Sequence, residues 1–326
     1  MTVLILNKRE IEQLLPMPEC IGLMESALAS LARGEVVLPL RPVLRVPDSP
    51  NVFAMMPAYS SSLRAIGAKL ITVFPGNHGT GVDSHQGAVL LMDGAQGTLL
   101  ALMDASSITA IRTAAVSGVA TKLLARDNAR TLAILGSGVQ GRSHIAAMLS
   151  ARPFEAVSVW SRSAEHARAL ASHASSQYGI RCEAASDPAT AVRSADVVCT
   201  VTASREPVLR GEWLQPGTHV NAVGASIPTA RELDTLAVKR SRLFVDRRES
   251  ALNEAGDVLI PISEKAIGPD HIAAELGELL VGAAGRRSDD DITLFKSLGL
   301  AIEDLASAHF LYDRARREKS GTWVEF

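Results

Sequence analysis

Leu135-Gly136-Ser137-Gly138-Val139-Gln140-Gly141 is the stretch that decides the fold. It has the form GxGxxG, follows the aliphatic segment TLAIL (131–135) and opens the helical pattern GRSHIAAML (141–149). In a dinucleotide-binding βαβ unit, the first glycine permits a tight turn, the second lets the backbone approach a pyrophosphate, and the third allows close packing of helix on strand. The N–H groups at the helix N-terminus favour the anion. This context of strand, loop and helix predicts a dinucleotide-binding domain.

The same stretch admits a second interpretation. Residues 136–143 also read GxxxxG followed by Arg142 and Ser143, which differs by one residue type from the phosphate-binding loop of nucleoside triphosphatases. That loop needs a lysine to reach the β- and γ-phosphates, and arginine is not equivalent to it. We therefore favour a dinucleotide over a triphosphate.

The end of the second strand selects between the two nicotinamide cofactors. NAD enzymes usually present Asp or Glu to the ribose 2′-hydroxyl at this point, about 20 residues past the loop. Here the strand-like segment AVSVW (156–160) is followed by Ser161-Arg162-Ser163, which holds no carboxylate. An arginine pairs well with a 2′-phosphate, although an ordinary exposed loop arginine would look the same. We favour NADPH over NADH.

Downstream of the loop, strand-like segments alternate with helical ones, which predicts βαβ units and a parallel sheet. These strand-like segments lie at 131–135, 156–160, 196–202, 219–224 and 242–246. Upstream, residues 36–104 consist of short aliphatic runs broken by Pro, Gly and Asn, with a hairpin turn at 94–97. That half is therefore expected to be β-rich and mostly antiparallel. Helical patterns predict helices over 9–33, ended by Gly34, over 106–125, and over 299–319.

Composition excludes several classes of protein. The chain has 326 residues, about two domains at the usual size, and 47% of them are hydrophobic. Its 33 basic and 35 acidic side chains nearly cancel and only 4% of residues are aromatic, which argues against nucleic-acid binding. The three cysteines form no CxxC pair, and no segment has the pattern of a signal peptide or a membrane span. We expect a cytoplasmic protein with neither nucleic acid nor membrane as a partner.

Three cations stand in apolar surroundings: Arg41 in PLRPV, Lys69 in IGAKLITVF and Arg112 in TAIRTAAV. Such a cation more often reaches solvent or forms an ion pair than binds a ligand. Three of them would suit a carboxylate substrate if the fold brings them together. Ser84 and His85, in the turn-rich segment 79–87, are candidate donors to the substrate or to a cofactor phosphate. No histidine pair has the spacing of metal ligands, and no GxSxG elbow supports serine hydrolysis.

Taken together, these segments resemble the ornithine cyclodeaminase/mu-crystallin family, and within it the ketimine reductase branch. The resemblance extends from about residue 36 to residue 313 and rests on motifs in a fixed order. These are MPAYS (56–60), AKLITVFPGN (68–77), SHQGAVLL (84–91), ITAIRTAAVSGVATKLL (108–124), LGSGVQGRSH (135–144), VTASREPVLRGEWLQPGTHVNAVGAS (201–226), REL (231–233) and FKSLGLAIEDL (295–305).

The resemblance implies an α/β fold in which a Rossmann doubly wound parallel sheet is joined to a β-rich domain that pairs strands across a homodimer. We expect the dinucleotide-binding domain at 116–299. The substrate-binding and dimerisation domain would be discontinuous, formed by 1–115 and 300–326.

The family transfers hydride at a carbon that bears nitrogen and a carboxylate, and its carboxylate clamp corresponds to Arg41, Lys69 and Arg112. In the family's cyclodeaminases an Asp near the Val-Gly step contacts the substrate amine, whereas Ser226 takes that position here. This difference and Arg162 both favour an NADPH-using reductase. The residues expected to contact the cofactor are Ser84, His85, Arg112, Thr113, Gly136, Ser137, Gly138, Val139, Gln140, Gly141, Ser161, Arg162, Ser163, Thr202, Ala203, Val223, Gly224 and Lys296.

The resemblance therefore predicts reduction of Δ1-pyrroline-2-carboxylate and/or Δ1-piperideine-2-carboxylate to L-proline or L-pipecolate, in proline metabolism or hydroxyproline degradation. Lys69 is the first candidate for proton donor, because Arg41 and Arg112 would lower its pKa through like charge. Carboxylate binding alone is its alternative role. Ser226 and His85 are further candidates for contacting the imine nitrogen. Three other functions stay open: an NAD-dependent ornithine cyclodeaminase, an alanine dehydrogenase-like oxidoreductase, and a non-catalytic NADPH- or ligand-binding protein.

Overall fold

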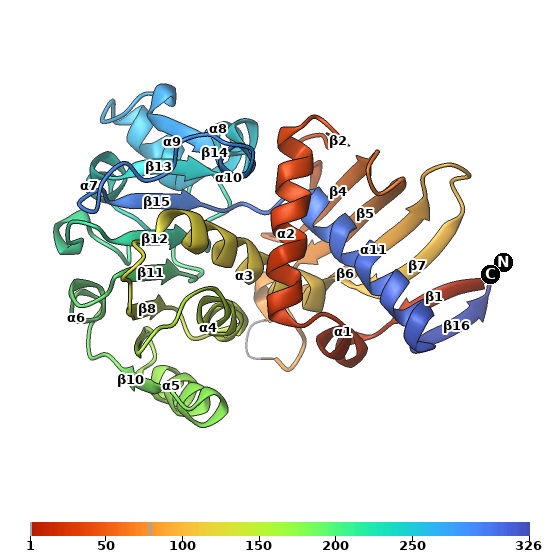
Figure 1. Cartoon of the computed structure of the whole chain (residues 1–326), viewed down its shortest axis with the longest axis horizontal. Coiled ribbons are helices and arrows are strands. Elements are labelled where there is room, and N and C mark those ends of the chain that lie inside the picture. Colours follow the sequence, from red (N-terminus) through yellow and green to blue (C-terminus); the bar gives the residue numbers. More distant parts are fainter. Residues whose placement is uncertain (1, 78–79) are drawn as a thin grey trace. The chain divides into compact units, whose positions relative to one another are not determined.

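The computed structural model describes residues 2–77 and 80–326, and the chain forms two compact units (Figure 1). Unit 1 comprises the residues up to Arg112 together with Leu300–Phe326, and unit 2 comprises Thr113–Gly299. Unit 1 is therefore discontinuous in sequence. The chain enters unit 2 within helix α3 (Ala105–Leu124) and leaves it after Gly299.

Unit 1 contains an eight-stranded sheet in the order β16-β1-β7-β6-β5-β4-β2, with β3 also paired to β4. Neighbouring strands are antiparallel except for the parallel pair β1 and β7, as expected for this half. Its predicted hairpin turn joins β6 to β7, where Gly97 has a φ of +69°. The strands are β1 (Thr2–Leu6), β2 (Val36–Val37), β3 (Val43–Arg45), β4 (Val52–Ser60), β5 (Ala65–Val73), β6 (His85–Asp93), β7 (Leu99–Asp104) and β16 (Thr322–Glu325).

The helix predicted over 9–33 is wrong in one respect, because two helices occupy this segment. They are α1 (Lys8–Leu14) and α2 (Met17–Ala32). Pro16 separates them with an extended backbone, since a proline inside a helix removes a hydrogen bond and clashes with the preceding turn. The predicted end is confirmed, because Gly34 adopts the left-handed conformation with a φ of +76°.

Helix α11 (Ala301–Glu318) covers one face of the unit 1 sheet over β4, β5 and β6, and α2 packs against it (Figure 1). Strand β5 alternates between two faces with the two-residue period of a strand, and its buried positions include Gly67 and Lys69. A Cβ placed on Gly67 would lie 2.8 Å from Cδ1 of Leu305, a residue of α11. Lys69 therefore lies on the face that α11 covers.

Unit 2 contains an eight-stranded, all-parallel sheet in the order β10-β9-β8-β11-β12-β15-β13-β14, which confirms the predicted α/β class. Strands β8, β11, β12 and β15 are almost wholly buried, as parallel strands with both faces covered must be. The strands are β8 (Thr131–Leu135), β9 (Ala156–Trp160), β10 (Arg181–Ala184), β11 (Val197–Thr200), β12 (His219–Ala222), β13 (Arg242–Val245), β14 (Ile272–Glu275) and β15 (Thr293–Lys296).

The strand order of unit 2 reverses direction between β8 and β11. From β8 the chain runs outward through β9 and β10, and then returns to build β11 and β12 on the other side. Ligands of doubly wound sheets bind outside the carboxyl ends of the strands at such a switch point. The helices of this unit besides α3 are α4 (Val139–Ala151), α5 (Ala164–Tyr178), α6 (Pro188–Arg193), α7 (Thr235–Arg240), α8 (Arg248–Glu254), α9 (Gly256–Ser263) and α10 (Leu276–Leu280).

Within residues 2–77 and 80–326, no helix combines the length and the apolar composition needed to cross a bilayer.

Candidate active site

Lys69 carries its ammonium group inside unit 1. Its strand partners Met56 and Val89 are buried and apolar, and the lysine side chain itself is only 3% exposed. Burial lowers the pKa of Lys69 to about 8, with further lowering by the positive charges of Arg112 and Arg41, while Asp304 opposes the change. A lysine in this state can give up a proton near neutral pH, which an ordinary surface lysine does not do.

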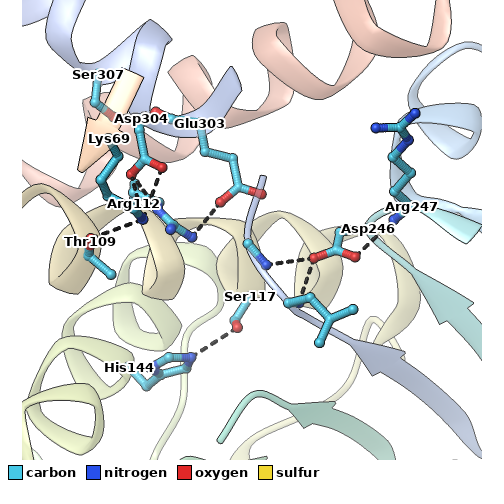
Figure 2. A network of polar contacts seen from close by, with 12 residues as sticks. Lys69, Thr109, Arg112, Ser117, His144, Asp246, Arg247, Glu303, Asp304 and Ser307 are labelled. Carbon is cyan, nitrogen blue, oxygen red and sulfur yellow. Dashed lines mark hydrogen bonds and ion pairs between the residues drawn. The ribbon is translucent and has the colours of Figure 1, made fainter. Parts of the chain in front are cut away.

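This ammonium and three other buried charges, those of Arg112, Glu303 and Asp304, form an ion-pair cluster (Figure 2). Lys69 Nζ lies 3.0 Å from Oδ2 of Asp304 and donates to Oγ1 of Thr109 at 3.3 Å. Arg112 donates through Nε to Oδ1 of Asp304 at 3.0 Å and through Nη1 to Oε2 of Glu303 at 2.6 Å. The two carboxylates therefore hold both cations in fixed positions, with Asp304 shared between them.

Asp304 is charged in this cluster. Burial acts to raise its pKa, but the nearby charges of Arg112 and Lys69 outweigh burial, so that the pKa of Asp304 is lowered. Asp304 and Glu303 stand in the first turn of α11, where the helix dipole also favours a negative charge.

Arg41 and His85 stand within electrostatic range of Lys69. Arg41 is partly buried between β2 and β3, and its charge contributes to lowering the pKa of Lys69. His85 is the first residue of β6. Its pKa is lowered mainly by partial burial and, to a smaller extent, by the positive charge of Lys69. Ser84 Oγ lies 3.1 Å from Nδ1 of His85. The three predicted cations and His85 thus all belong to unit 1. Gly79, at the start of the predicted turn segment, lies outside the described residues.

Sequence reasoning did not identify Thr109, Glu303 or Asp304 as part of this site. The two carboxylates carried a signal, since adjacent acids open an otherwise helical segment within the motif FKSLGLAIEDL. Acids near a helix N-terminus are also favoured by the dipole of any helix, so this signal alone does not assign them to a site.

The glycine-rich loop of unit 2 has the geometry that its three glycines predict. Gly136 has a φ of +127°, and a Cβ on it would lie 2.6 Å from the carbonyl oxygen of Val201. A Cβ on Gly141 would lie 2.3 Å from the carbonyl oxygen of Gly136, so helix and loop pack with no room for a side chain. Gly138, by contrast, is exposed and would have nothing within 4 Å of a Cβ.

The loop also leaves the start of α4 open to an anion. Gly138 is the N-cap residue of α4, so no side chain caps the helix, and no acidic residue stands in the first turn. The first N–H groups of α4 therefore have no capping partner within the described chain, and the space beside Gly138 is open to a ligand. Oε1 of Gln140 is buried beside them with no hydrogen-bond partner among the described residues. These residues fit a dinucleotide pyrophosphate.

The end of β9 carries the residues expected near the adenosine ribose. Ser137 of the glycine loop donates to Oγ of Ser161 at 2.8 Å, and Ser163 caps α5 by accepting from the N–H of His166. Arg162 is exposed between them, and its side chain has no ion-pair or hydrogen-bond partner in the part of the chain that the structure describes.

Further predicted contacts follow the carboxyl ends of β11 and β12, the two strands beyond the switch point. Thr202 and Ala203 follow β11, Val223 and Gly224 follow β12, and Ser226 is exposed two residues further on. Lys296 differs from them, because its ammonium is fully buried at the end of β15 and lies 3.0 Å from Oδ2 of Asp257. Thr113 is buried in α3, where unit 2 begins.

Residues 2–77 and 80–326 contain no group of three or more His, Cys, Asp or Glu side chains that could hold a metal ion.

Comparison with known proteins gives full-length matches. The model of the ornithine cyclodeaminase/mu-crystallin family matches residues 1–319. The ketimine reductase mu-crystallin of Mus musculus is 44% identical over 293 residues, which are 89% of this chain and 90% of the mouse protein. The Δ1-pyrroline-2-carboxylate reductase of Bacillus cereus (strain ATCC 14579) is 39% identical over 326 residues, covering 99% of this chain and 100% of that protein.

Two solved structures are similar over the whole chain. One is Thermococcus litoralis Δ1-pyrroline-2-carboxylate reductase in complex with NADH and L-proline, with a TM-score of 0.96, 38% identity, and coverage of 98% of this chain and 99% of that one. The other is an archaeal alanine dehydrogenase dimer with bound NAD, with a TM-score of 0.94, 32% identity and complete coverage of both chains.

Proposed function

This chain belongs to the ornithine cyclodeaminase/mu-crystallin family, and on that premise we propose that it is an NAD(P)H-dependent ketimine reductase. It reduces a cyclic imine carboxylate, Δ1-pyrroline-2-carboxylate or Δ1-piperideine-2-carboxylate, to L-proline or L-pipecolate. The observation that carries this proposal is the full-length similarity to a reductase solved with NADH and L-proline. The buried cations of unit 1 agree with it, because a substrate of this class carries one carboxylate.

Substrate binding is assigned to the cations of unit 1. Arg41, Lys69 and Arg112 bind the carboxylate of the imine, and Asp304 and Glu303 keep two of these cations in place before substrate arrives. A site organised in advance loses less entropy on binding and orients the reacting carbon. A planar guanidinium also suits a carboxylate because it can donate two parallel hydrogen bonds.

When bound, the nicotinamide cofactor supplies the hydride. The chain supplies the proton, since an imine accepts hydride readily only when its nitrogen is protonated. Lys69 is the first candidate, because its pKa of about 8 leaves the ammonium charged at neutral pH and able to release a proton. His85 and Ser226 are the further candidates for contacting the imine nitrogen.

NADPH is the proposed cofactor, with NADH as the alternative. The support is the segment that follows β9, where exposed Arg162 stands between two serines and no carboxylate is available for a ribose 2′-hydroxyl. The cofactor phosphates are assigned to the loop 136–141, whose open position at Gly138 and uncapped helix start are suited to a pyrophosphate.

Homodimerisation is proposed through the outer face of the unit 1 sheet, the face that α11 does not cover. Several large apolar side chains are exposed on this face of β3, β4 and β5: Leu44, Met55, Tyr59 and Ile66. An exposed apolar patch of this kind marks an interaction surface more often than an isolated apolar residue does. The similar archaeal alanine dehydrogenase was solved as a dimer.

A cofactor oxidation assay with the purified chain tests the function. NADPH and NADH are each offered with Δ1-pyrroline-2-carboxylate, Δ1-piperideine-2-carboxylate, and pyruvate plus ammonia, and ornithine with NAD is assayed for ammonia release. We expect turnover with the cyclic imines and faster turnover with NADPH. Turnover only with pyruvate and ammonia would identify an alanine dehydrogenase, release of ammonia from ornithine a cyclodeaminase, and no turnover with any substrate a binding protein.

A further inference from the structure

Glu232 is a fully buried carboxylate that the proposed reaction does not use. It stands in the segment between β12 and α7, and its carbonyl oxygen accepts hydrogen bonds from the backbone N–H groups of Val208 and Leu209. Burial raises the pKa of Glu232, the charge of Asp257 raises it further, and Lys296 opposes both. A buried carboxylate is costly unless it is well hydrogen-bonded, so its partners indicate why it is there.

Four donors converge on this one carboxylate, from the last residue of β11 and from the loops that follow β11 and β12. Oε1 of Glu232 accepts from the backbone N–H of Thr202 at 2.6 Å and from its hydroxyl at 2.7 Å. Oε2 accepts from the backbone N–H of Gly224 at 2.6 Å and from the hydroxyl of Thr200 at 2.9 Å. The carboxylate therefore joins the loop that follows β11 to the loop that follows β12.

Gly224 gives a second, independent indication of the same junction. A Cβ on this residue would lie 2.0 Å from the carbonyl oxygen of Thr202 and 2.6 Å from Oε1 of Glu232. Real Cβ atoms do not tolerate such distances, so the two loops approach each other as closely as a glycine permits. Their separation is thus set on one side by the backbone of Thr202 and on the other by the carboxylate.

A second carboxylate fixes the first. Oδ1 of Asp257 accepts from the backbone N–H groups of Glu232 and Leu233 at 2.8 and 3.0 Å, and its Oδ2 lies 3.0 Å from Nζ of Lys296. Lys296 in turn donates to the carbonyl oxygen of Ala222 at 3.2 Å, at the end of β12. The network thus spans the carboxyl ends of β11, β12 and β15, three adjacent strands of the parallel sheet.

We propose that Glu232 is a positioning residue that sets the two loops against which the nicotinamide half of the cofactor binds. This proposal rests on the proposed function and on the expected cofactor contacts of Thr202 and Gly224, which lie across the switch point from β9 and its adenosine-side residues. The adenosine half is assigned to other residues, those of the glycine loop and of the segment 161–163. Loss of Glu232 should therefore weaken binding of the nicotinamide ring selectively.

The test compares two ligands that differ only in the nicotinamide ring, which 2′-phospho-ADP-ribose lacks. Dissociation constants of NADPH and of 2′-phospho-ADP-ribose are measured by titration for the wild type and for Glu232→Gln, with NADH and ADP-ribose as a second pair. The glutamine keeps the shape of the side chain, but its NH2 group cannot accept the hydrogen bonds that one carboxylate oxygen accepts now. We expect the dissociation constant of NADPH to rise at least about tenfold and that of 2′-phospho-ADP-ribose to stay unchanged.

Two further variants make the comparison decisive. Glu183→Gln is the matched control, since Glu183 lies on β10 of the same unit and pairs only with exposed Arg181 in the described structure. We expect it to bind both ligands as the wild type does. Thr200→Val removes a single donor to Glu232 and carries the test if Glu232→Gln does not fold, with a smaller selective loss of NADPH binding as the expected result.

Equal weakening of both ligands, or no weakening of either, would overturn the proposal. The first result would make Glu232 a general structural residue, and the second would leave it without a role at the loops. The binding measurements need no turnover, so they stand even if the wild type fails to reduce any cyclic imine, a result that would contradict the proposed function alone.

Discussion

Lys69 and Asp304 are 235 residues apart in the sequence, yet Nζ of the lysine lies 3.0 Å from Oδ2 of the aspartate in the interior of unit 1. The lysine comes from a strand of the sheet and the aspartate from the first turn of α11 (Figure 2). Asp304 also accepts from Arg112, so that a single carboxylate holds two of the three cations assigned to the substrate.

Asp304→Asn should destabilise the protein strongly. The substitution leaves two buried cations with one fewer negative partner, and breaking a buried pair in this way typically costs about 3–5 kcal/mol of unfolding free energy. Denaturant unfolding measures the loss. Glu19→Gln is the control, because Glu19 forms an exposed pair with Arg314 on the same unit and should cost less than about 1 kcal/mol. Equal losses for the two variants would contradict this prediction.

The pH dependence of kcat/KM should report Lys69. Its pKa of about 8 in the free enzyme means that the proton needed for imine reduction is present below that pH and is lost above it. We therefore expect kcat/KM to fall as the pH rises through about 8, and kcat to drop about 10²- to 10⁴-fold in Lys69→Arg. If the arginine variant keeps full kcat and the same profile, Lys69 only binds the carboxylate, and the pH dependence belongs to another group.

Substitutions at two glycines of the dinucleotide loop should differ in their effects on cofactor affinity and on stability. A Cβ at position 138 meets no protein atom within 4 Å, so we expect Gly138→Ala to leave the melting temperature unchanged. Its methyl group would occupy the space proposed for the pyrophosphate, so we expect the dissociation constant of the cofactor to rise at least about tenfold. Gly141→Ala places a Cβ 2.3 Å from the carbonyl oxygen of Gly136 and should lower stability by about 1–3 kcal/mol as well. Thermal unfolding and cofactor titration of both variants check this. Normal cofactor affinity in Gly138→Ala would exclude pyrophosphate binding at this loop.

Arg162→Ala should reverse the preference between cofactors. A charged hydrogen bond to the 2′-phosphate is worth about 1.5–3 kcal/mol, which corresponds to a rise in KM for NADPH of roughly 10- to 100-fold. KM for NADH should not change, because NADH lacks that phosphate. Arg168→Ala, at an exposed position of α5, serves as the control. A wild type that prefers NADH, or a variant that loses both cofactors equally, would refute the assignment.

Met55→Asp should weaken the proposed dimer. Met55 is 41% exposed on the outer face of β4, and a carboxylate buried at an apolar interface without a partner is costly. Sedimentation analysis is expected to give a dimer for the wild type and a shift toward monomer for the variant. Leu236→Asp, on unit 2, replaces an equally exposed apolar residue and should leave the dimer intact. A monomeric wild type would end the proposal.

Local features of the sequence predicted much of unit 2. The glycine loop is recognisable from the sequence because the tight turn, the approach of the backbone to a pyrophosphate and the packing of helix on strand each require a glycine at a fixed position. The family membership inferred from the ordered motifs is confirmed. Strand β15 was missed, since the four residues Thr293–Lys296 carry little periodicity and insert between β12 and β13 out of chain order. The break between α1 and α2 was not predicted, because the helical spacing of apolar residues over 9–33 was given more weight than the tendency of Pro16 to interrupt a helix.

The sequence singles out the three cations but not the two carboxylates that pair with Lys69 and Arg112. Lys69 and Arg112 were conspicuous because each interrupts an apolar run, whereas Glu303 and Asp304 stand where acids are common in any helix. Nothing local indicates that a carboxylate in the last long helix lies against a lysine in a central strand. Glu232 was missed for the same reason, since its four donors belong to other segments. Lys296 stays a prediction as a cofactor contact.

The discontinuity of unit 1 has a consequence for the chain as it leaves the ribosome. Unit 2 is one continuous segment and can fold while synthesis proceeds. The sheet of unit 1 lacks β16, and Lys69 and Arg112 lack α11, until residues 301–325 have been made. A nascent chain would thus complete unit 2 before the ion-pair cluster of unit 1 can form. A product that ends before α11 would expose the apolar face of β4, β5 and β6 that this helix covers in the complete unit.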